Sequence, residues 1–224
     1  MEQKRNFQLE LEKLLKSIET CEKVPTLLLH SCCAPCSSYV LEYLATFFNI
    51  TVLYYNPNIS SSEEYLKRME EEKRLIGIYN EEKKGHTIKM MDVDHEPQVF
   101  YETVKGLEQC KEGGERCFAC YELRLQKTVE LAKENGFDYF GTTLTISPLK
   151  NAQKLNEIGE RLGKLHQVKW LYSDFKKKGG YLRSIELSEK YGLYRQDFCD
   201  CSFSKTEREE QKRLRQEQQL QEQL

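Results

Sequence analysis

Hydrophobic and polar positions along this chain follow two alternating patterns, which predict the order of strands and helices. Short runs rich in β-branched, aromatic and leucine residues, such as TLLLH and ITVLYY, are separated by longer stretches with helical periodicity. Polar, Gly-containing or Pro-containing segments divide many of these runs. The pattern predicts five strands, over residues 26–30, 50–55, 86–93, 137–144 and 168–172.

The intervening segments carry helix-start and helix-stop signals. Ser61 and Glu64 form a Ser-x-x-Glu start, and Gly136 and Gly192 stand where a glycine closes a helix. Strands that alternate with helices at this spacing favour a parallel sheet. We predict an α/β fold: an open, mostly parallel, Rossmann-like sheet of about five strands with helices on both faces. The predicted helices cover residues 6–22, 38–48, 61–83, 96–107, 118–136, 151–165 and 181–192.

Composition divides the chain into a core domain and two flanking segments. Its 224 residues suit one domain with a small appendage. We predict an amphipathic N-terminal helix (1–24), an α/β catalytic domain with a cysteine metal site (25–204) and a charged C-terminal helix or tail (205–224). The N-terminus lacks a signal-peptide pattern, and no apolar run approaches the roughly 20 residues that span a bilayer. We therefore expect a cytoplasmic protein without disulfides and without membrane partners.

Seven of the nine cysteines form three tight groups, in HSCCAPCSS, ERCFACYE and DFCDCSF. One tetrahedral metal or one cubane cluster takes about four thiolates, so seven exceed the needs of a single centre. The pattern indicates two metal centres, or one centre beside a redox-active thiol pair. The predicted metal ligands are Cys32, Cys33, Cys36, Cys117, Cys120, Cys199 and Cys201.

The predicted strands bring much of the unusual sequence to one edge of the sheet. Cys32, Cys33 and Cys36 follow the first strand, and the Cys117 pair lies after the third strand at the start of a helix. In open α/β sheets, ligands bind at the carboxyl ends of the strands. We therefore predict a metal site at this edge.

Three other interpretations of the cysteines remain open at this point. A structural zinc site uses CxxC pairs, although it leaves three thiols over. A thioredoxin-like CxxC accounts for only one pair. Cysteines also pack as small apolar residues, which is the simplest account of the isolated Cys21 and Cys110.

Polar residues near the predicted edge suggest how a substrate binds. The segment GTTLTISPLKN offers hydroxyl and amide groups, and YRQDFCDC places aromatic, cationic and amide side chains beside the last cysteines. Neither GxxxxGK[ST] nor GxGxxG occurs, so no nucleotide-phosphate loop is indicated. The candidate substrate-binding residues are Asn56, Asn58, Thr142, Thr143, Ser147, Lys150, Asn151, Arg195 and Gln196.

An ordered set of motifs resembles the QueH family. The motifs are LLHSCCAPC, YYNPN followed by EEYLKR, RCFACYELRL, TTLTISPLKN, KKGGY and YRQDFCDCSFS, within about residues 25–205. The family comprises cobalamin-independent epoxyqueuosine reductases, so the resemblance implies reduction of the epoxide of epoxyqueuosine to the alkene of queuosine at the tRNA wobble position. It also implies a [4Fe-4S] cluster beside a mononuclear metal, expected to be iron with zinc as the alternative. Some members have Asp where this chain has Cys36, and a thiolate there softens the metal site.

The resemblance implies tRNA carrying epoxyqueuosine as substrate and an external electron donor of the ferredoxin or flavodoxin type. We predict that Cys117, Cys120 and Cys199 bind the cluster, and that Cys33, Cys36 and Cys201 bind the single metal, with Cys32 on either. A nearby acid must protonate the leaving oxygen. The candidates are His30, Tyr55, Tyr194 and Asp197. The alternatives are a zinc-binding RNA-recognition module and a thiol-based tRNA-modifying or redox enzyme.

Overall fold

The chain forms an open sheet of five parallel strands in the order β3-β2-β1-β4-β5. The computed structural model describes residues 5–196, 199, 201–207, 210 and 213. This sheet confirms the predicted fold class. The two edge strands are the shortest, at three and two residues. The strands are β1 (Thr26–His30), β2 (Asn49–Leu53), β3 (Lys89–Met91), β4 (Tyr139–Thr142) and β5 (Lys169–Trp170).

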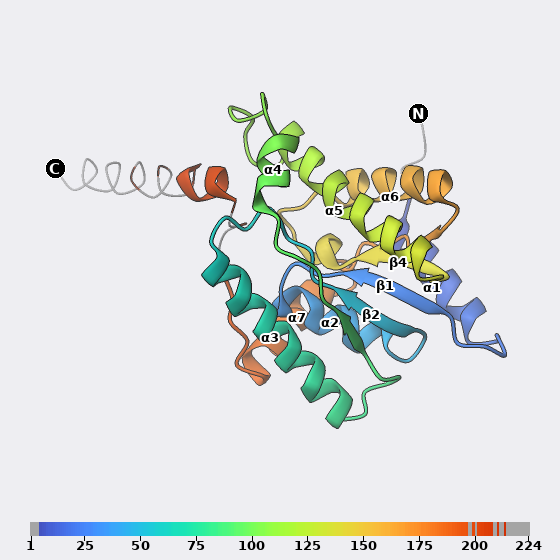
Figure 1. Cartoon of the computed structure of the whole chain (residues 1–224). Helices are drawn as coiled ribbons and strands as arrows, with labels where there is room; N and C mark the ends of the chain where they lie inside the picture. The colour runs from blue at the N-terminus through green and yellow to red at the C-terminus, as the bar shows by residue number, and fades with distance from the viewer. Residues whose placement is uncertain (1–4, 197–198, 200, 208–209, 211–212, 214–224) are drawn as a thin grey trace.

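Helices cover both faces of the sheet (Figure 1). Helix α2 packs against α3 and α7 on one face, and α5 packs against α6 on the other. A short 3-10 helix, η1 (Thr143–Ile146), follows β4 directly. The α-helices are α1 (Phe7–Ile18), α2 (Ala34–Leu44), α3 (Ser62–Glu81), α4 (Pro97–Thr103), α5 (Glu115–Glu134), α6 (Ala152–His166) and α7 (Gly180–Lys190).

The central strand β1 supplies apolar side chains to both faces of the sheet. Leu27 and Leu29 lie in the cluster under α1, α2 and α3, whereas Leu28 lies in the cluster under α5 and α6. Successive strand residues point to opposite faces, so a continuous apolar run suits a strand that is covered on both sides. All three leucines are fully buried.

Two helices begin at least three residues earlier than the sequence pattern predicts, and both differences involve cysteines. Helix α2 begins at Ala34, not near residue 38, because Pro35 fits the first turn and Cys33 caps the helix in an extended conformation. Cys36 therefore lies inside the helix. Helix α5 begins at Glu115, which places Cys117 in its first turn.

The predicted glycine stops are confirmed. Gly136 follows the C-cap of α5 with φ of 67°, and Gly192 follows the C-cap of α7 with φ of 57°. Positive φ is costly for residues with a Cβ, so glycine suits both positions. Each glycine ends its helix at the point where the chain turns back.

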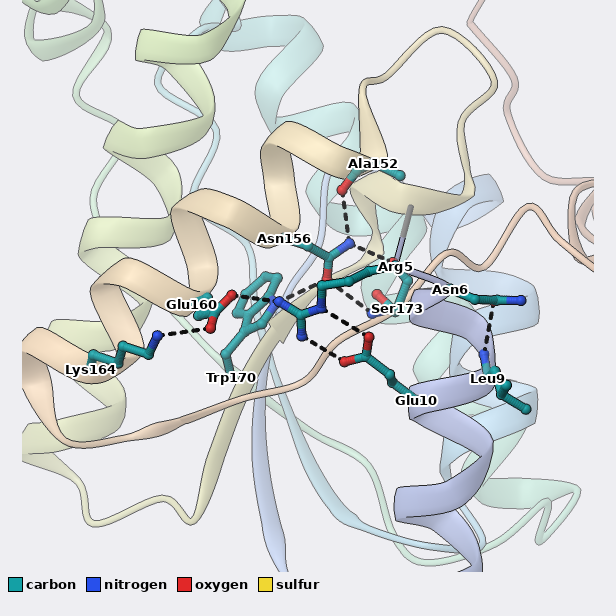
Figure 2. Close-up of polar contacts among 10 residues, drawn as sticks. All are labelled: Arg5, Asn6, Leu9, Glu10, Ala152, Asn156, Glu160, Lys164, Trp170 and Ser173. Carbon is teal, nitrogen blue, oxygen red and sulfur yellow. Dashed lines mark hydrogen bonds and ion pairs between the residues drawn. The ribbon is translucent and has the colours of Figure 1, made fainter. Parts of the chain in front are cut away.

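Helix α1 packs onto the main core. Leu11 and Leu15 belong to the cluster that includes β1. At the N-terminal end of α1, the Arg5 guanidinium donates to Glu10 at 2.7 and 3.0 Å and to Glu160 of α6 at 2.7 Å (Figure 2). These ion pairs are exposed, so each adds little stability, but together they orient the helix end.

Asn156 of α6 makes four hydrogen bonds, of which one stays within α6 and three join the helix to β5 and the segment after it (Figure 2). Its amide nitrogen donates to the carbonyls of Ala152 and Ser173, at 2.8 and 2.9 Å. Its amide oxygen accepts from Trp170 Nε1 at 3.0 Å and from the Ser173 amide at 3.1 Å. A buried amide with every bond satisfied fixes where the chain leaves this edge strand.

Two further predictions concern the ends of the chain and membranes. Residues 202–207 are helical, and most of the predicted tail over 205–224 lies outside the described residues. Among the helices that the structure describes, none combines the length and the apolar character needed to cross a membrane.

A carboxyl group lies fully buried behind the start of α2. Glu72 of α3 has no solvent exposure, and neither carboxylate oxygen makes a hydrogen bond of ordinary geometry. Burial raises the pKa of Glu72 to about 7, although the nearby hydroxyls of Ser37 and Ser31 offset part of the effect. Those two hydroxyls are hydrogen-bonded to each other at 2.6 Å.

Glu72→Gln is expected to remove a pH-dependent destabilisation. Between its ordinary pKa of 4.5 and about 7, the carboxyl ionises in the unfolded chain but stays protonated in the folded protein, so stability falls as pH rises. The difference corresponds to about 3 kcal/mol at pH 8. Urea unfolding at pH 5 and pH 8 should show a gain for the variant only at the higher pH.

Glu70→Gln is the matched control, because Glu70 lies on the same helix with its side chain 66% exposed. Its free energy of unfolding should follow the wild type at both pH values. Equal pH profiles for the Glu72 variant and the wild type would contradict the assignment of a neutral buried carboxyl.

Candidate metal centre and substrate cavity

The sheet reverses its direction of winding between β1 and β4. The chain passes from β1 to β2 and β3 on one side, then crosses to place β4 and β5 on the other. The loops after β1 and β4 therefore leave the sheet in opposite directions, and a crevice opens at their carboxyl ends. Cys32 and Thr143 lie on the two sides of this crevice, with their Sγ and Oγ1 atoms 3.8 Å apart.

Three cysteines converge on one point at the start of α2. The sulfurs of Cys32, Cys33 and Cys36 all lie within 4.8 Å of one another. The Cys32 and Cys33 sulfurs are 3.8 Å apart. A tetrahedral metal with bonds of about 2.3 Å to sulfur holds its ligands about 3.8 Å apart, so this group has the spacing of ligands to one metal ion. Cys33 is the N-cap and Cys36 lies in the first helical turn.

The three thiols differ in how readily they ionise. Hydrogen bonds from Cys33 and Cys36 hold the pKa of the Cys32 thiol well below its ordinary value. The same contacts, together with burial, raise the pKa of Cys33 and Cys36. Cys32 is therefore the thiol of the group that ionises most readily, and a bound cation would favour ionisation of the other two.

The remaining four cysteines of the three groups surround a second cavity. Cys117 and Cys120 come from α5, and Cys199 and Cys201 come from the segment after α7. Among the residues that the structure describes, only the first group has three sulfurs within 4.8 Å of one another. The four thiols are thus spread too widely for one small ion but suit a cluster whose ligands bind different irons.

Three of these four sulfurs already accept hydrogen bonds. The Gly113 amide donates to Cys117 Sγ at 3.2 Å, and the Ser204 amide donates to Cys201 Sγ at 3.3 Å. Lys150 Nζ donates to Cys199 Sγ at 3.2 Å. Donors to sulfur stabilise thiolates and are among the contacts by which proteins tune iron–sulfur centres.

Three cations line the four-cysteine cavity, of which Arg116 and Arg124 are buried and Lys150 is largely covered. Arg116 pairs with Glu207 at 2.6 Å, and Lys150 lies 3.6 Å from Glu112. Arg124 is the third. Burial disfavours its charge, but the thiols of Cys120, Cys199 and Cys32 outweigh that effect and raise the pKa of Arg124. The cavity wall therefore places positive charge beside the thiols.

A larger cavity of about 500 Å³ adjoins the four-cysteine cavity. Asn58, Arg124, Lys150 and Cys199 line both. A volume of this size accommodates a drug-sized or nucleoside-sized ligand. Of the predicted metal and substrate-binding residues, those that line it are Cys32, Cys33, Cys36, Cys199, Asn56, Asn58, Ser147, Lys150, Arg195 and Gln196.

Comparison with known proteins identifies the family. The family model described as "Epoxyqueuosine reductase QueH" matches residues 27–207. The chain belongs to the QueH family. The match includes all seven grouped cysteines and both cavities.

Curated relatives share this similarity over most of their length. A protein of Streptococcus pyogenes serotype M1 named Epoxyqueuosine reductase QueH is 43% identical over 202 residues, covering 90% of this chain and 79% of that protein. A protein of the same name from Staphylococcus epidermidis is also 43% identical, over 90% of this chain and 85% of its own length. One from Thermotoga maritima is 32% identical over 83% of this chain and 93% of its own.

Three predicted substrate-binding residues of this QueH chain lie outside the larger cavity. Thr142 and Thr143 are fully buried at the end of β4, where the Thr142 hydroxyl accepts a hydrogen bond from the Leu144 amide. Asn151 caps α6 by accepting from the Lys154 amide at 3.0 Å, and it lines a neighbouring surface groove. The two threonines therefore belong to the packed end of β4, and Asn151 belongs to the neighbouring groove.

Of the four predicted proton donors, three lie away from the cavity lining. His30 is fully buried: its Nδ1 accepts from the Thr142 hydroxyl at 2.9 Å and its Nε2 donates to the Tyr55 carbonyl at 3.0 Å. Burial lowers the pKa of His30 to about 3, and burial raises that of Tyr55 to about 12. Tyr194 stacks under Lys67, with Nζ 3.5 Å from the ring centre. Asp197 lies outside the described residues.

The structure adds cavity residues that sequence reasoning missed. Arg124 follows Cys120 by four residues, so both lie on the same face of α5, and that spacing was the available signal. Arg68 reaches the cavity from α3, and Tyr181 reaches it from the first turn of α7. Glu112 lies in the loop before α5, and nothing in its sequence neighbourhood indicates its role.

Proposed function

We propose that this protein is an epoxyqueuosine reductase acting on tRNA. The observation that carries the proposal is the common wall between a thiol-lined cavity and a cavity large enough for a modified nucleoside, in a chain of the QueH family. In the reaction, the epoxide takes up two electrons and two protons. Both carbon–oxygen bonds break, the carbon–carbon double bond forms, and the oxygen leaves as water.

The two groups of thiols divide the proposed metals between them. Cys117, Cys120, Cys199 and Cys201 would hold a [4Fe-4S] cluster, because they are spread around one cavity. Cys32, Cys33 and Cys36 would hold the single metal, because their spacing suits one ion. This division differs from the sequence-based one, which grouped Cys201 with Cys33 and Cys36. When bound, the two centres would supply single electrons and a Lewis acid for the epoxide oxygen.

The soft donor set also bears on the identity of the single metal. Three thiolates suit iron or zinc better than magnesium or calcium. Cys36 contributes a sulfur where some relatives are expected to have a carboxylate. We propose iron at this position, and metal analysis of the purified protein distinguishes it from zinc.

The larger cavity supplies the contacts that hold the substrate. The amide side chains of Asn56, Asn58 and Gln196 face it, and the Oδ1 of Asn58 and the Oε1 of Gln196 have no protein partner. Buried amide oxygens without partners are suited to accept hydrogen bonds from a base or sugar. A nucleobase enters such a cavity only after it leaves the anticodon stack.

Proton-bearing groups on the cavity wall are placed to serve the leaving oxygen. Lys150 Nζ, the Glu112 carboxyl and the Tyr181 hydroxyl belong to residues that line the cavity. We propose that protons reach the oxygen through these groups, since His30, Tyr55 and Tyr194 lie away from the cavity lining. An external donor of the ferredoxin or flavodoxin type would supply the electrons.

A basic groove next to the cavity fits the RNA backbone. Lys150 lines both, and the groove also contains Arg5 and the three lysines 176–178. These cations outnumber the two carboxylates of the groove, Glu12 and Asp174, which pair with two of the lysines. Phosphates of an anticodon loop extend on both sides of the modified nucleotide, so a cationic surface beside the cavity provides for them. Lys177 and Lys178 are the most exposed lysines of the groove.

Cys117→Ala is expected to abolish cluster assembly, because it removes one of four thiolate ligands. Anaerobically purified wild type should contain about four irons and four sulfides for the cluster plus one further metal. The variant should lose the sulfide and the visible absorption, together with the reduction of epoxyqueuosine in tRNA. Iron, sulfide and zinc analysis with a visible spectrum measures this.

Cys110→Ala is the control, since Cys110 lies seven residues earlier and lines neither cavity. It should keep wild-type iron and sulfide. A Cys117 variant with full iron and sulfide would refute the ligand assignment. Wild-type protein with zinc and no sulfide would instead support a zinc-binding RNA-recognition module.

The double substitution of Lys177→Gln and Lys178→Gln should weaken tRNA binding about tenfold at moderate salt. Each lost phosphate contact should lower the slope of log K against log salt by about 0.7, the value for single strands. Fluorescence anisotropy with labelled tRNA at several salt concentrations tests both expectations.

Lys133→Gln serves as the control for the loss of a surface lysine. Lys133 lies in the last turn of α5, at the end of the helix opposite to Cys117. Its tRNA affinity and salt slope should match those of the wild type. An unchanged slope in the double variant would show that the RNA backbone takes another path.

A further inference from the structure

Arg124 is a buried cation without a carboxylate partner. Its side chain is 2% exposed, and no carboxylate in the described part of the chain lies within 4.0 Å of it. Nε donates to the Cys120 carbonyl at 3.3 Å, and Nη1 reaches Asn56 Oδ1 at 3.5 Å. Nη2 is buried and has no hydrogen-bond partner. A guanidinium held in this way needs a nearby anion to offset its desolvation.

The other two cations of the four-cysteine cavity already have such partners. Arg116 pairs with Glu207, and Lys150 pairs with Glu112. Arg124 is therefore the cation whose charge is not offset by a carboxylate of the described chain. It lines both cavities, so its charge lies between the four-cysteine group and the substrate cavity.

We propose that Arg124 is the counter-charge of the group bound by the four cysteines and raises its reduction potential. The inference rests on the proposed function, because it assumes a redox cluster at these thiols. Reduction adds one negative charge, and a fixed cation stabilises the reduced form more than the oxidised form. Water is largely excluded here, so the interaction is screened little. Arg124 is thus a positioning residue that makes electron uptake by the site easier.

A phosphate of the substrate is a second anion that would suit the unpartnered Nη2. The location of Arg124 one helical turn after Cys120 favours the thiolate-bound group, since its Nε is hydrogen-bonded to the backbone of a ligand. That bond ties the guanidinium to the same helix face as the thiol. The position of the charge relative to the four sulfurs is therefore fixed before any substrate arrives.

The test is the midpoint potential of the loaded protein in the absence of tRNA. Arg124→Gln should disfavour reduction by at least tenfold, which is a fall of about 59 mV for a one-electron couple. Arg124→Lys keeps the charge and should lie close to the wild type. Anaerobic redox titration followed by electron paramagnetic resonance reports the potential, independently of turnover.

Arg161→Gln is the control for the loss of an arginine. Arg161 is 53% exposed and pairs with Glu122 at 2.7 Å on the surface of α6. Its midpoint potential should equal that of the wild type. An unchanged potential in Arg124→Gln, with weakened tRNA binding alone, would overturn the proposal and assign Arg124 to the substrate.

A second variant keeps the test decisive if Arg124→Gln fails to fold. Asn56→Asp places a carboxylate beside Arg124 Nη1 and offsets its charge without removing the side chain. Its potential should fall in the same direction, and a potential equal to the wild type would overturn the proposal. If the wild type carries no iron or sulfide, the proposed function is refuted. If it carries both and the midpoint potential does not respond to the Arg124 variants, only the proposed role of Arg124 is refuted.

Discussion

The reversal of the parallel sheet between β1 and β4 is the constraint on which the site depends. Because the loops after these two strands diverge, a crevice opens at the carboxyl ends of the strands. The first three cysteines enter it from β1, and α5 brings Cys117 and Cys120 to the same end of the sheet. Residues separated by up to about 170 positions thereby become neighbours, without any covalent link between them.

Charge balance in a dry environment is the second organising feature. Thiols placed near one another repel as they ionise, and burial raises the pKa of Cys120 and Cys201. Arg116, Arg124 and Lys150 supply opposite charge from the same walls. A buried cation and a buried thiolate are each costly alone, so opposite charges on the same walls stabilise one another.

The sequence predicted the parallel sheet and the end of it that carries the cysteines, because apolar runs and cysteine spacing are local signals. Periodicity did not show that α2 begins at Ala34, since a proline is compatible with either a loop or a first helical turn. The spacing of Arg124 from Cys120 indicates a shared helix face, but a charged position on an amphipathic helix ordinarily faces water, so the pattern alone does not predict that Arg124 is buried. The separation of the cysteines into a tight triad and a wider ring depends on tertiary contacts, chiefly those that bring Cys201 to Cys120.

The two outer strands are short, which affects whether two molecules of this protein can associate through the edges of their sheets. Strands β3 and β5 pair with the sheet over only three and two residues, so each edge presents few unpaired backbone groups. Beyond β5, the backbone of Ser173 is hydrogen-bonded to the Asn156 side chain of α6 and not to a further strand. Extended edges invite strand addition between molecules, and short ones discourage it. The sheet can thus be rich in aliphatic side chains at its centre without offering a template for aggregation at its margins.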